Sequence, residues 1–331
     1  MNKRLFAGAA LFLLSVTTAQ AIDLDQPEVR SFIDSMVEEH DFDREELRDI
    51  LGAAEVKDSI LEAIARPAEK TLSWAEYREH FLTRERIDAG AAFWVENKDT
   101  LESISIDTGV PVEILVGIIG VETYYGRITG SYRVLDALAT LAFSYPPRSK
   151  FFRRELQEYL LLVREEGMQA ADATGSYAGA MGRPQFMPSS YRAYAVDSTG
   201  DGKRDIWDDW TDVAGSIANY FLKHGWKPGE EVTAQASLGG TWQGATPEPA
   251  NTLKASETIA SLSRQGVMFV TDLPADNKSE LLTFEGDDGA EHWVGFHNFF
   301  VITRYNRSVM YALAVHQLGQ EVAIEVNGDA S

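Results

Sequence analysis

The stretch from 109 to 126, Gly-Val-Pro-Val-Glu-Ile-Leu-Val-Gly-Ile-Ile-Gly-Val-Glu-Thr-Tyr-Tyr-Gly, constrains the fold more than any other part of the chain. Its apolar residues are too continuous for a surface helix with a narrow apolar stripe, so the stretch predicts a helix that is buried on most sides. Pro111 is typical of a first helical turn, and Gly126 is typical of a C-terminal cap. The rest of the chain has to pack around this helix.

One carboxylate, Glu122, stands at the end of the apolar run. Burial against a low-dielectric wall disfavours its ionised form, and so does the partial negative charge of a helix C-terminus. We therefore expect Glu122 to keep its proton to a higher pH than an ordinary glutamate does. The alternative is a side chain that reaches the surface or pairs with Arg127.

Residues 1–21 have the pattern of a secretory signal peptide. Lys3 and Arg4 precede an apolar run from 5 to 16, and Ala-Gln-Ala at 19–21 is typical of a cleavage site. The pattern predicts a mature chain from about Ile22, located in the periplasm, soluble and without stable membrane insertion. The sequence contains no cysteine, which excludes disulfides and a lipid-acceptor cysteine.

The net charge is −21, from 30 Lys and Arg residues against 51 Asp and Glu residues. Such a charge argues against nucleic acid or an anionic membrane as a partner. The segment 127–154 is nevertheless locally basic, which suggests a ligand that carries carboxylates. Alternatively, Arg153 and Arg154 belong to a solvated helix face.

The succession of patterns predicts an α+β fold that is mainly α. We expect a helical subdomain at 22–70, a helical core at 71–226, a small β domain at 227–298 and a helical return to the core at 299–331. Helices are predicted at 27–39, 44–53, 58–65, 85–96, 98–108, 135–143, 151–166, 189–196, 211–224 and 307–319. Strands are predicted at 231–236, 252–255, 267–269, 280–284 and 292–295.

The segment 197–208, Asp-Ser-Thr-Gly-Asp-Gly-Lys-Arg-Asp-Ile-Trp-Asp, resembles the calcium loop of an EF-hand. Its oxygen donors at loop positions 1, 3 and 5, its glycine at 6 and a backbone carbonyl at 7 suit a hard cation. At position 12 the EF-hand pattern has a bidentate glutamate, whereas this chain has the shorter Asp208. Either the side chain of Asp208 reaches the cation, or the loop is longer and Asp212 completes the ligands. The predicted ligands of a structural Ca²⁺ are Asp197, Thr199, Asp201, the carbonyl of Lys203, and Asp208 or Asp212. The alternative is an acidic turn without a cation.

The segment 175–188, Gly-Ser-Tyr-Ala-Gly-Ala-Met-Gly-Arg-Pro-Gln-Phe-Met-Pro, is rich in glycine and in large apolar residues. The glycines indicate backbone conformations or close approaches that a Cβ would forbid. Its aromatic and methionine side chains need cover, which favours a partly buried functional loop over an ordinary surface loop.

The sequence lacks the residues or motifs that several kinds of catalysis require. The six histidines show no metal-ligand spacing, a thiol nucleophile is excluded, and neither a G-x-S-x-G motif nor a phosphate loop is present. A protonated Glu122 beside aromatic and polar groups suits the cleavage of a glycosidic bond. Hydrolases of that kind add a second carboxylate, for which Asp136 is the nearest candidate in the sequence, although not a compelling one.

The segments 109–126, 136–141, 175–190, 219–226 and 302–306, together with the EF-hand-like loop, resemble the lytic murein transglycosylase B family. The likeness runs in order from about Trp74 to Gln320. It implies a lysozyme-like catalytic core, peptidoglycan glycan strands as the substrate and no organic cofactor. It also implies that Glu122 alone serves as acid and base, because the muramoyl 6-hydroxyl attacks its own C1 and forms a 1,6-anhydro end. Other proteins of cell-wall synthesis or remodelling are possible partners.

The resemblance implies further site residues. Ser176 would be a hydrogen-bond partner near Glu122. The implied sugar contacts are Tyr77, Gln185, Phe186, Tyr220, Tyr305, Asn306 and Tyr311. For each tyrosine the alternative is core packing with a locally bonded hydroxyl. Arg183 and Pro184 depart from the family pattern, as does the missing lipid-acceptor cysteine. Two other functions stay open: a hydrolytic muramidase that uses Asp136, and a calcium-stabilised peptidoglycan-binding protein without activity.

Overall fold

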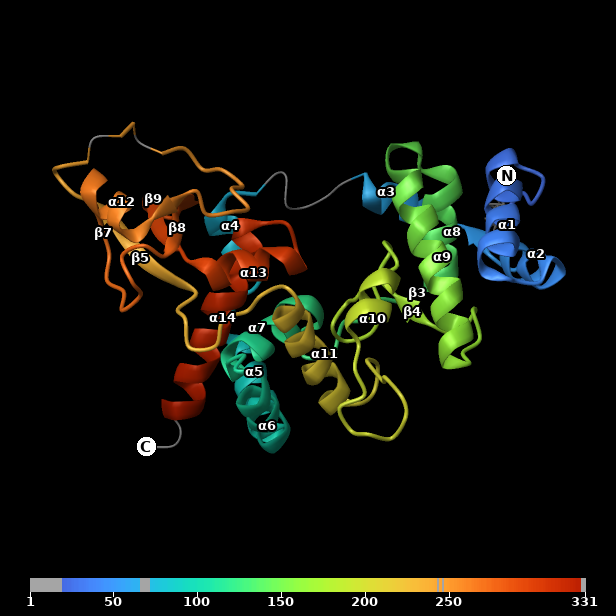
Figure 1. Cartoon of the computed structure of the whole chain (residues 1–331), viewed down its shortest axis with the longest axis horizontal. Coiled ribbons are helices and arrows are strands. Elements are labelled where there is room, and N and C mark those ends of the chain that lie inside the picture. The colour runs from blue at the N-terminus through green and yellow to red at the C-terminus, as the bar shows by residue number, and fades with distance from the viewer. Residues whose placement is uncertain (1–19, 66–71, 243, 246, 329–331) are drawn as a thin grey trace, which may run out of the picture.

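The computed structural model describes residues 20–65, 72–242, 244–245 and 247–328 (Figure 1). Residues 1–19 of the predicted signal peptide lie outside the described residues. Strand β1 (Gln20–Ala21) pairs antiparallel with β2 (Glu55–Val56). Among the described residues, no single helix is long and apolar enough to span a membrane, while α6 (Lys98–Thr108) and α7 (Val112–Thr123) pass that test only as a pair bent by 118°.

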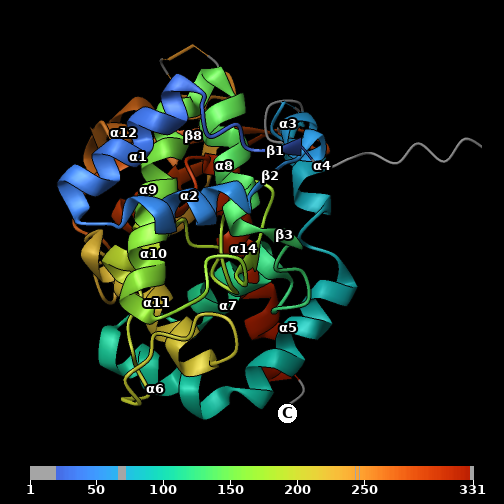
Figure 2. The same cartoon turned by 90° about the vertical axis from the view of Figure 1, so that its right-hand side faces the viewer.

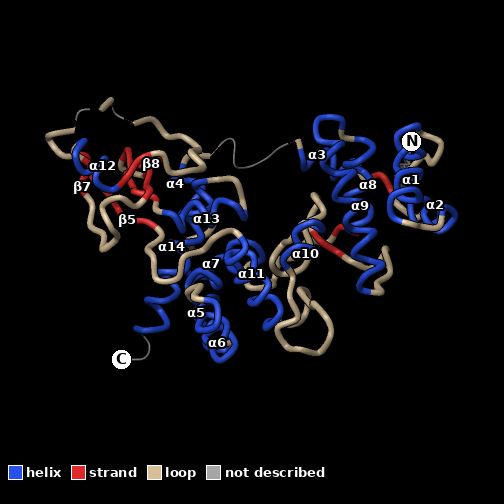
Figure 3. The backbone as a smooth tube through the Cα atoms, viewed as in Figure 1, coloured by secondary structure: helices blue, strands red, loops and turns tan. Residues whose placement is uncertain are grey.

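The chain is mainly helical; the five-stranded sheet lies at one end of the molecule, and two short strand pairs lie among the helices (Figure 3). The other helices are α1 (Pro27–His40), α2 (Arg44–Gly52), α3 (Asp58–Ile64), α4 (Trp74–Glu79), α5 (Arg84–Glu96), α8 (Val134–Ser144), α9 (Ser149–Glu166), α10 (Pro188–Tyr194), α11 (Trp210–Lys223), α12 (Ile259–Gln265), α13 (His297–Tyr305) and α14 (Val309–Gly328), with a 3₁₀ turn η2 (Pro146–Arg148). The predicted helices are found within a few residues of these bounds, except that α14 continues nine residues beyond the predicted end at 319. Helices α4 and α12 were not predicted, and α13 lies where a helical return to the core was expected from 299.

The small β domain contains an antiparallel sheet of strand order β6-β8-β9-β5-β7. Its strands are β5 (Thr233–Leu238), β6 (Glu257–Thr258), β7 (Val267–Met268), β8 (Lys278–Gly286) and β9 (Gly289–Gly295). The predicted strand at 252–255 is wrong, because that segment is irregular and its neighbour Asn251 binds the backbone of Arg307 and Val309 instead. A separate pair, β3 (Tyr132–Arg133) and β4 (Thr174–Gly175), joins two distant segments.

Local sequence signals set several helix ends. Ser73 begins α4 through a capping box with Glu76, and Asp209 begins α11 by accepting hydrogen bonds from two backbone amides. Gly109 ends α6 in the left-handed conformation, with φ of 67°. These caps let the chain turn sharply on both sides of α7.

Helix α7 lies at the centre of the helical core, in contact with α5, α6, α11 and α14 (Figure 1). The prediction of a helix buried on most sides is confirmed, since nine of its residues are buried. Helix α14 crosses it at backbone distance. An added Cβ at Gly117 would lie 2.3 Å from the carbonyl oxygen of Val315, and one at Gly319 would lie 2.1 Å from that of Glu113. Only glycine permits this approach.

The predicted ends of α7 need a correction. Pro111 precedes the helix as its N-cap, and the helix ends at Thr123, three residues before the predicted cap Gly126. The cap is Tyr124, which is left-handed, and the next residue is left-handed as well, with φ of 51° and 57°. Tyr125 is held in this turn because its ring packs beside the bare backbone of Gly90 and Gly120.

The N-terminal helices pack on two helices from later in the sequence. Helix α3 and strand β2 contact α8, which in turn packs along α9. The rings of Phe32 and Phe143 lie 5.9 Å apart, and Arg164 donates to the carbonyl of His40 at 2.8 Å. Figures 1 and 2 show these helices at the end of the molecule opposite the sheet. The structure therefore groups 22–65 with α8 and α9, which the sequence-based division placed in the core.

Candidate active site

Glu122 occupies the last turn of α7, with its side chain partly exposed. The hydroxyl of Tyr311 in α14 donates a hydrogen bond to Glu122 Oε1 at 2.6 Å. Tyr311 is 2% exposed, so the donor side of this contact is shielded from water. The proposed catalytic carboxylate thus has one oxygen held by a neutral donor, and α14 fixes the position of that donor.

Aromatic side chains from three further elements support Tyr311. Tyr305 of α13 stacks on it with ring centroids 6.4 Å apart, and Tyr220 of α11 lies 4.8 Å from Tyr305. Phe186 lies 5.8 Å from both Tyr220 and Tyr305. Four of the sequence-predicted sugar contacts are therefore brought together in one aromatic cluster behind the carboxylate.

The hydroxyls of this cluster are directed by backbone carbonyls. Tyr305 donates to Pro184 and Tyr220 donates to Arg304, each at 2.6 Å. Burial, together with the negative charge of Glu122, raises the pKa of Tyr311 and of Tyr305 well above the ordinary value. Both tyrosines stay protonated at neutral pH, and Tyr311 can only donate to an ionised Glu122.

The turn that follows α7 ties the helix to the glycine-rich loop. Thr123 is buried, and its hydroxyl donates to the carbonyl of Arg183 at 3.2 Å and accepts from the amide of Gly126 at 3.1 Å. The guanidinium of Arg183 lies 3.9 Å from the ring of Trp210. The position next to the carboxylate therefore fastens two segments that are 60 residues apart.

The glycine-rich loop at 175–188 is packed into the protein, as predicted. A Cβ at Gly179 would meet the side chain of Leu138 at 2.5 Å, and one at Gly182 would meet the carbonyl of Ile206 at 2.6 Å. Ser176 accepts hydrogen bonds from two amides of its own loop, at 3.3 and 3.1 Å. The hydroxyl of Ser176 thereby holds the shape of the loop.

The remaining predicted sugar contacts differ in their exposure. Gln185 is left-handed at φ of 52°, and its side-chain amide donates to the carbonyls of Thr129 and Gly182. Phe186 is 1% exposed, and Tyr220 is also buried, so these two rings mainly pack against their neighbours within the aromatic cluster. Their contact with sugar stays a prediction.

Tyr77 and Asn306 come from two further elements. Tyr77 of α4 is buried between the rings of Trp74 and Phe81, and it adds to the raised pKa of Tyr311. Asn306 directly follows α13 and is partly exposed. Their sugar-binding roles also stay predictions.

The EF-hand-like loop is closed by carboxylates that bind backbone amides. Asp197 accepts from the amides of residues 200, 201 and 202, which lowers its pKa, and Gly202 is left-handed at φ of 89°. Asp212 is 1% exposed and accepts from the amides of Ser198, Thr199 and Asp205. Within the described part of the chain, no three His, Asp or Glu side chains converge as they would on a metal ion.

The two alternatives for the last cation ligand lie in different places. The side chain of Asp208 is 89% exposed, and its nearest charged partner is Arg183, with N and O atoms 3.9 Å apart. Asp212 lies across the loop and touches both of its ends. Of the two, Asp212 is the one that faces the loop interior.

Comparison with known proteins decides the family. The family model described as the transglycosylase SLT domain matches residues 24–320. The chain belongs to this family. The predictions of an enzyme, of a lytic transglycosylase acting on peptidoglycan and of a mainly helical α+β fold are confirmed.

Individual relatives of this SLT transglycosylase cover nearly its whole length. The membrane-bound lytic murein transglycosylase B of Escherichia coli is 42% identical over 309 residues, which are 91% of this chain and 84% of the relative. The structure of catenated lytic transglycosylase SltB1 from Pseudomonas aeruginosa has a TM-score of 0.85 at 48% identity, with 91% of this chain and 98% of that chain covered. The Escherichia coli lytic transglycosylase Slt35 in complex with calcium has a TM-score of 0.84 at 42% identity, with 93% and 97% covered.

Asp136, the candidate second carboxylate, has a structural role in this SLT transglycosylase. It is buried in α8, accepts from the amide of Glu55 at 3.0 Å and pairs with Arg133 at 3.5 Å. Its neighbour one turn on, Thr140, also binds the backbone of β2. Asp136 thus fastens the N-terminal segment, which leaves no support for its use as a second catalytic group.

Sequence reasoning missed three residues that shape the site. Thr123 fastens the glycine-rich loop, Asp209 caps α11, and Asp205 accepts from the amides of Trp207 and Asp208 in the cation loop. The signals for the last two were present, because aspartate before a helix or a turn commonly accepts such bonds. The role of Thr123 depends on a contact across the fold and had no local signal.

Proposed function

We propose that Glu122 is the single acid and base of this lytic transglycosylase. The supporting observation is the contact of Tyr311 with Glu122, which holds one carboxylate oxygen in a largely buried setting. The bond cleaved would be the β-1,4 bond between N-acetylmuramic acid and N-acetylglucosamine. The product would carry a 1,6-anhydromuramoyl end.

In the first step, Glu122 would transfer its proton to the glycosidic oxygen as the bond from muramic acid C1 breaks. In the second step, the resulting carboxylate would accept the proton of the muramoyl 6-hydroxyl while that oxygen bonds to C1. The nucleophile is the 6-hydroxyl of the substrate, so the reaction needs no second carboxylate from the enzyme. The structural role of Asp136 is compatible with this mechanism.

The residues around Glu122 would position the glycan. Ser176, whose oxygen accepts from its own loop, has a hydroxyl proton to offer toward Glu122 or the sugar. The proposed sugar contacts are Tyr77, Gln185, Phe186, Tyr220, Tyr305, Asn306 and Tyr311. Asn306 would orient an N-acetyl group, since its amide both donates and accepts. We also place the enzyme in the periplasm, where its substrate lies.

We propose that the loop at 197–212 holds a structural Ca²⁺. The donors fit by chemistry, since Asp197, Thr199, Asp201 and the carbonyl of Lys203 stand at the EF-hand positions 1, 3, 5 and 7. Asp212 is favoured as the closing ligand because its carboxylate already faces the loop. The crystallised relative with calcium supports the choice of ion. The ion would supply rigidity, while the chemistry stays with Glu122.

The substitution Glu122→Gln tests the catalytic assignment. Glutamine keeps the size and an acceptor for Tyr311 but cannot deliver a proton, so we expect turnover of peptidoglycan sacculi to fall at least 1000-fold with an unchanged melting temperature. Mass spectrometry of the fragments released by the wild type should show anhydro ends, which lack the water of reducing ends. An active Glu122→Gln protein would refute the role of Glu122 as acid and base. Reducing ends in the fragments from the wild type would refute the 1,6-anhydro product.

A further inference from the structure

The backbone of Arg183 lies between the cation loop at 197–212 and the turn that follows Glu122. The amide of Arg183 donates to the carbonyl of Ile206 in the cation loop at 2.9 Å. Its carbonyl accepts from the hydroxyl of Thr123 at 3.2 Å, and Thr123 directly follows Glu122 in the chain. One residue of the glycine-rich loop therefore bonds to the cation loop on one side and to the end of α7 on the other.

The side chain of Arg183 contacts the same two regions. Its Nη1 donates to the carbonyl of Asp208 at 2.9 Å, and its guanidinium lies 3.9 Å from the ring of Trp210, the first residue of α11. This ring lies against the turn after α7, because an added Cβ at Gly126 would be 3.0 Å from the ring edge. The guanidinium and the ring together join the cation loop to the turn beside the carboxylate.

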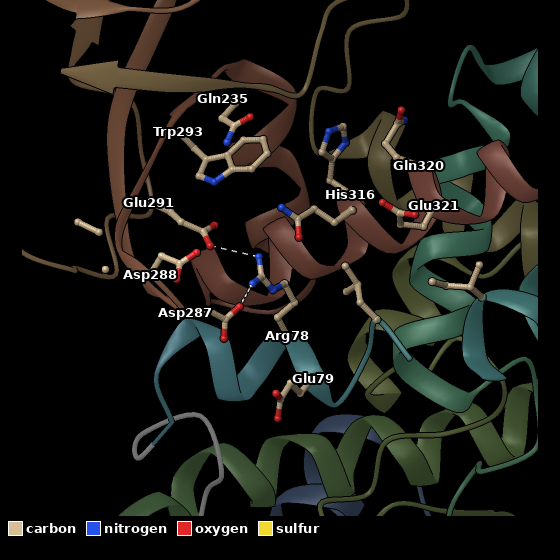
Figure 4. A pocket seen from close by; sticks show the side chains of 15 residues that line it. Arg78, Glu79, Gln235, Asp287, Asp288, Glu291, Trp293, His316, Gln320 and Glu321 are labelled. Carbon is tan, nitrogen blue, oxygen red and sulfur yellow. Dashed lines mark hydrogen bonds and ion pairs between the residues drawn. The ribbon is translucent and has the colours of Figure 1, made fainter. Parts of the chain in front are cut away.

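The contacts of Arg183 differ in kind from those of Arg78. Arg78 pairs with Asp287 and Glu291 between α4 and the sheet (Figure 4). Within the described residues, the one carboxylate within 4 Å of Arg183 is that of Asp208, whose oxygen is 3.9 Å away and beyond hydrogen-bond distance. A guanidinium can stack on a ring with its face while its edge donates to a carbonyl, which a lysine ammonium cannot do. The contacts of Arg183 therefore depend on its flat shape and not only on its charge.

The place of Glu122 is set from two sides. The hydroxyl of Tyr311 holds its carboxylate from α14, whereas the next residue, Thr123, is held from the glycine-rich loop by Arg183. A general acid has to stand within hydrogen-bond reach of the oxygen that it protonates. A displacement of about 1 Å can lower the rate by about 100-fold. The contact on the Thr123 side is therefore as relevant to turnover as the contact with Tyr311.

We propose that Arg183 is a positioning residue for Glu122, which sets the place of the catalytic carboxylate relative to the cation loop. A shift of the cation loop moves the carbonyl of Ile206 and, through the backbone of Arg183, the side chain of Thr123. The cation loop then affects turnover as well as stability. The proposal rests on the proposed function for the role of Glu122, whereas the contacts of Arg183 do not depend on it.

Steady-state kinetics on soluble glycan strands tests the proposal. Arg183→Met keeps a long side chain but loses the guanidinium. We expect kcat to fall by about tenfold while KM changes by less than about twofold, because the carboxylate is displaced and the glycan contacts remain. Arg183→Lys keeps the charge without the flat group, so it should recover less than about half of the lost rate.

Three kinetic results would overturn the proposal. The first is a wild-type kcat in both variants. The second is a raised KM at unchanged kcat, which would make Arg183 a residue of substrate binding. The third is full activity of Arg183→Lys, which would assign the effect to charge alone. If Arg183→Met does not fold, the comparison of Arg183→Lys with the wild type carries the test.

Arg192→Met is the matched control for lost stability. Arg192 joins α10 to α9 through ion pairs with Glu158 and Glu165. Its replacement should lower the melting temperature and leave kcat unchanged at temperatures below melting. An equal loss of kcat in Arg192→Met and Arg183→Met would show a general effect of stability and refute the positioning role.

Hydrogen exchange separates this proposal from the proposed function. The amides of Gly126 and Ile128 donate to the hydroxyl and the carbonyl of Thr123. They should exchange faster in Arg183→Met than in the wild type. Unchanged exchange would refute the positioning role even when Glu122→Gln is inactive. Faster exchange together with an active Glu122→Gln protein would refute the proposed function and the positioning role, and only the contact between Arg183 and Thr123 would stand.

Discussion

The hydroxyl of Tyr311 acts on Glu122 in the direction opposite to burial. A donor to a carboxylate stabilises the ionised form, whereas the apolar wall of α7 stabilises the protonated form. An acid that must later act as a base needs both forms within reach of the working pH. The pair is therefore suited to a carboxyl group that gives and then accepts a proton.

The substitution Tyr311→Phe should expose this balance. Without the donor the carboxylate is less stable, so the pKa of Glu122 should rise and the alkaline limb of the pH–rate profile should move to higher pH. We expect kcat/KM to fall by about tenfold to 100-fold at neutral pH, the effect of roughly 1.5–3 kcal/mol for a hydrogen bond to a charged group. Tyr159→Phe, which removes a buried hydroxyl bonded to the carbonyl of Ala170, is the matched control. An alkaline limb that does not move would show that Tyr311 leaves the carboxylate unaffected.

The sequence predicted the catalytic acid Glu122 but not the hydrogen bond that it accepts from Tyr311. Glu122 ends an apolar run, and that pattern is local. The contact with Tyr311 spans 189 positions and depends on where α14 crosses α7, which no local pattern records. The resemblance to the family named Tyr311 as a cleft residue, and the structure adds the bond.

The crossing of α7 and α14 is the element on which the site depends. Gly117 and Gly319 allow the two backbones to touch, and the same crossing brings Tyr311 to Glu122. The sequence predicted the first helix from its continuous apolar residues. The sequence could not predict why α7 needs glycine at Gly117, because glycine in a helix indicates close packing only once the partner helix is known.

The substitution Gly117→Ala should separate the two helices. The new methyl group would lie 2.3 Å from the carbonyl of Val315, so α14 must move or α7 must bend. We expect a loss of about 1–3 kcal/mol in the free energy of unfolding, together with a lower kcat. Gly52→Ala, at the end of α2, places its methyl 3.6 Å from Leu24 and should change neither. Denaturant titration and the rate on sacculi measure both effects, and a stable, fully active Gly117→Ala protein would contradict the argument.

The cation loop offers a test that separates its two candidate ligands. EDTA should lower the melting temperature of the wild type, because a structural ion that binds only the folded state stabilises it. Asp212→Asn should lower the melting temperature and remove the EDTA effect, whereas Asp208→Asn should keep that effect. The opposite pattern would assign the ligand to Asp208. A wild-type melting curve unchanged by EDTA would count against a structural cation altogether.

In the whole molecule, segments that are distant in the sequence pack together as one unit. The helices of 22–65 bury their apolar residues against α8 and α9, which lie about 80 residues further on, as the bond from the Glu55 amide to Asp136 shows with its separation of 81. The sequence predicted the order of helices and strands and the fold class. It could not predict this grouping, because domain boundaries were placed where the composition changes and not where contacts end.

A fragment of residues 20–65 should therefore fail to fold by itself. Its helices are short, Phe32 would lose its contact with Phe143, and α3 would lose its packing on α8. We expect a circular dichroism spectrum of largely unfolded chain, while the same residues stay protected from hydrogen exchange in the full protein. A cooperative melting transition of the isolated fragment would show that the segment is an independent domain.

Tyr124 and Tyr125, whose backbones are in the left-handed conformation after α7, constrain which substitutions can be selected during evolution. Each such residue costs on the order of 1–3 kcal/mol relative to glycine at the same place. Replacement of Tyr124 or Tyr125 by glycine would relieve that cost and at the same time remove rings that hold the end of the helix beside Glu122. Selection for heat resistance and selection for turnover would then favour different residues at these positions. Thermostable variants of this enzyme are better sought elsewhere in the chain.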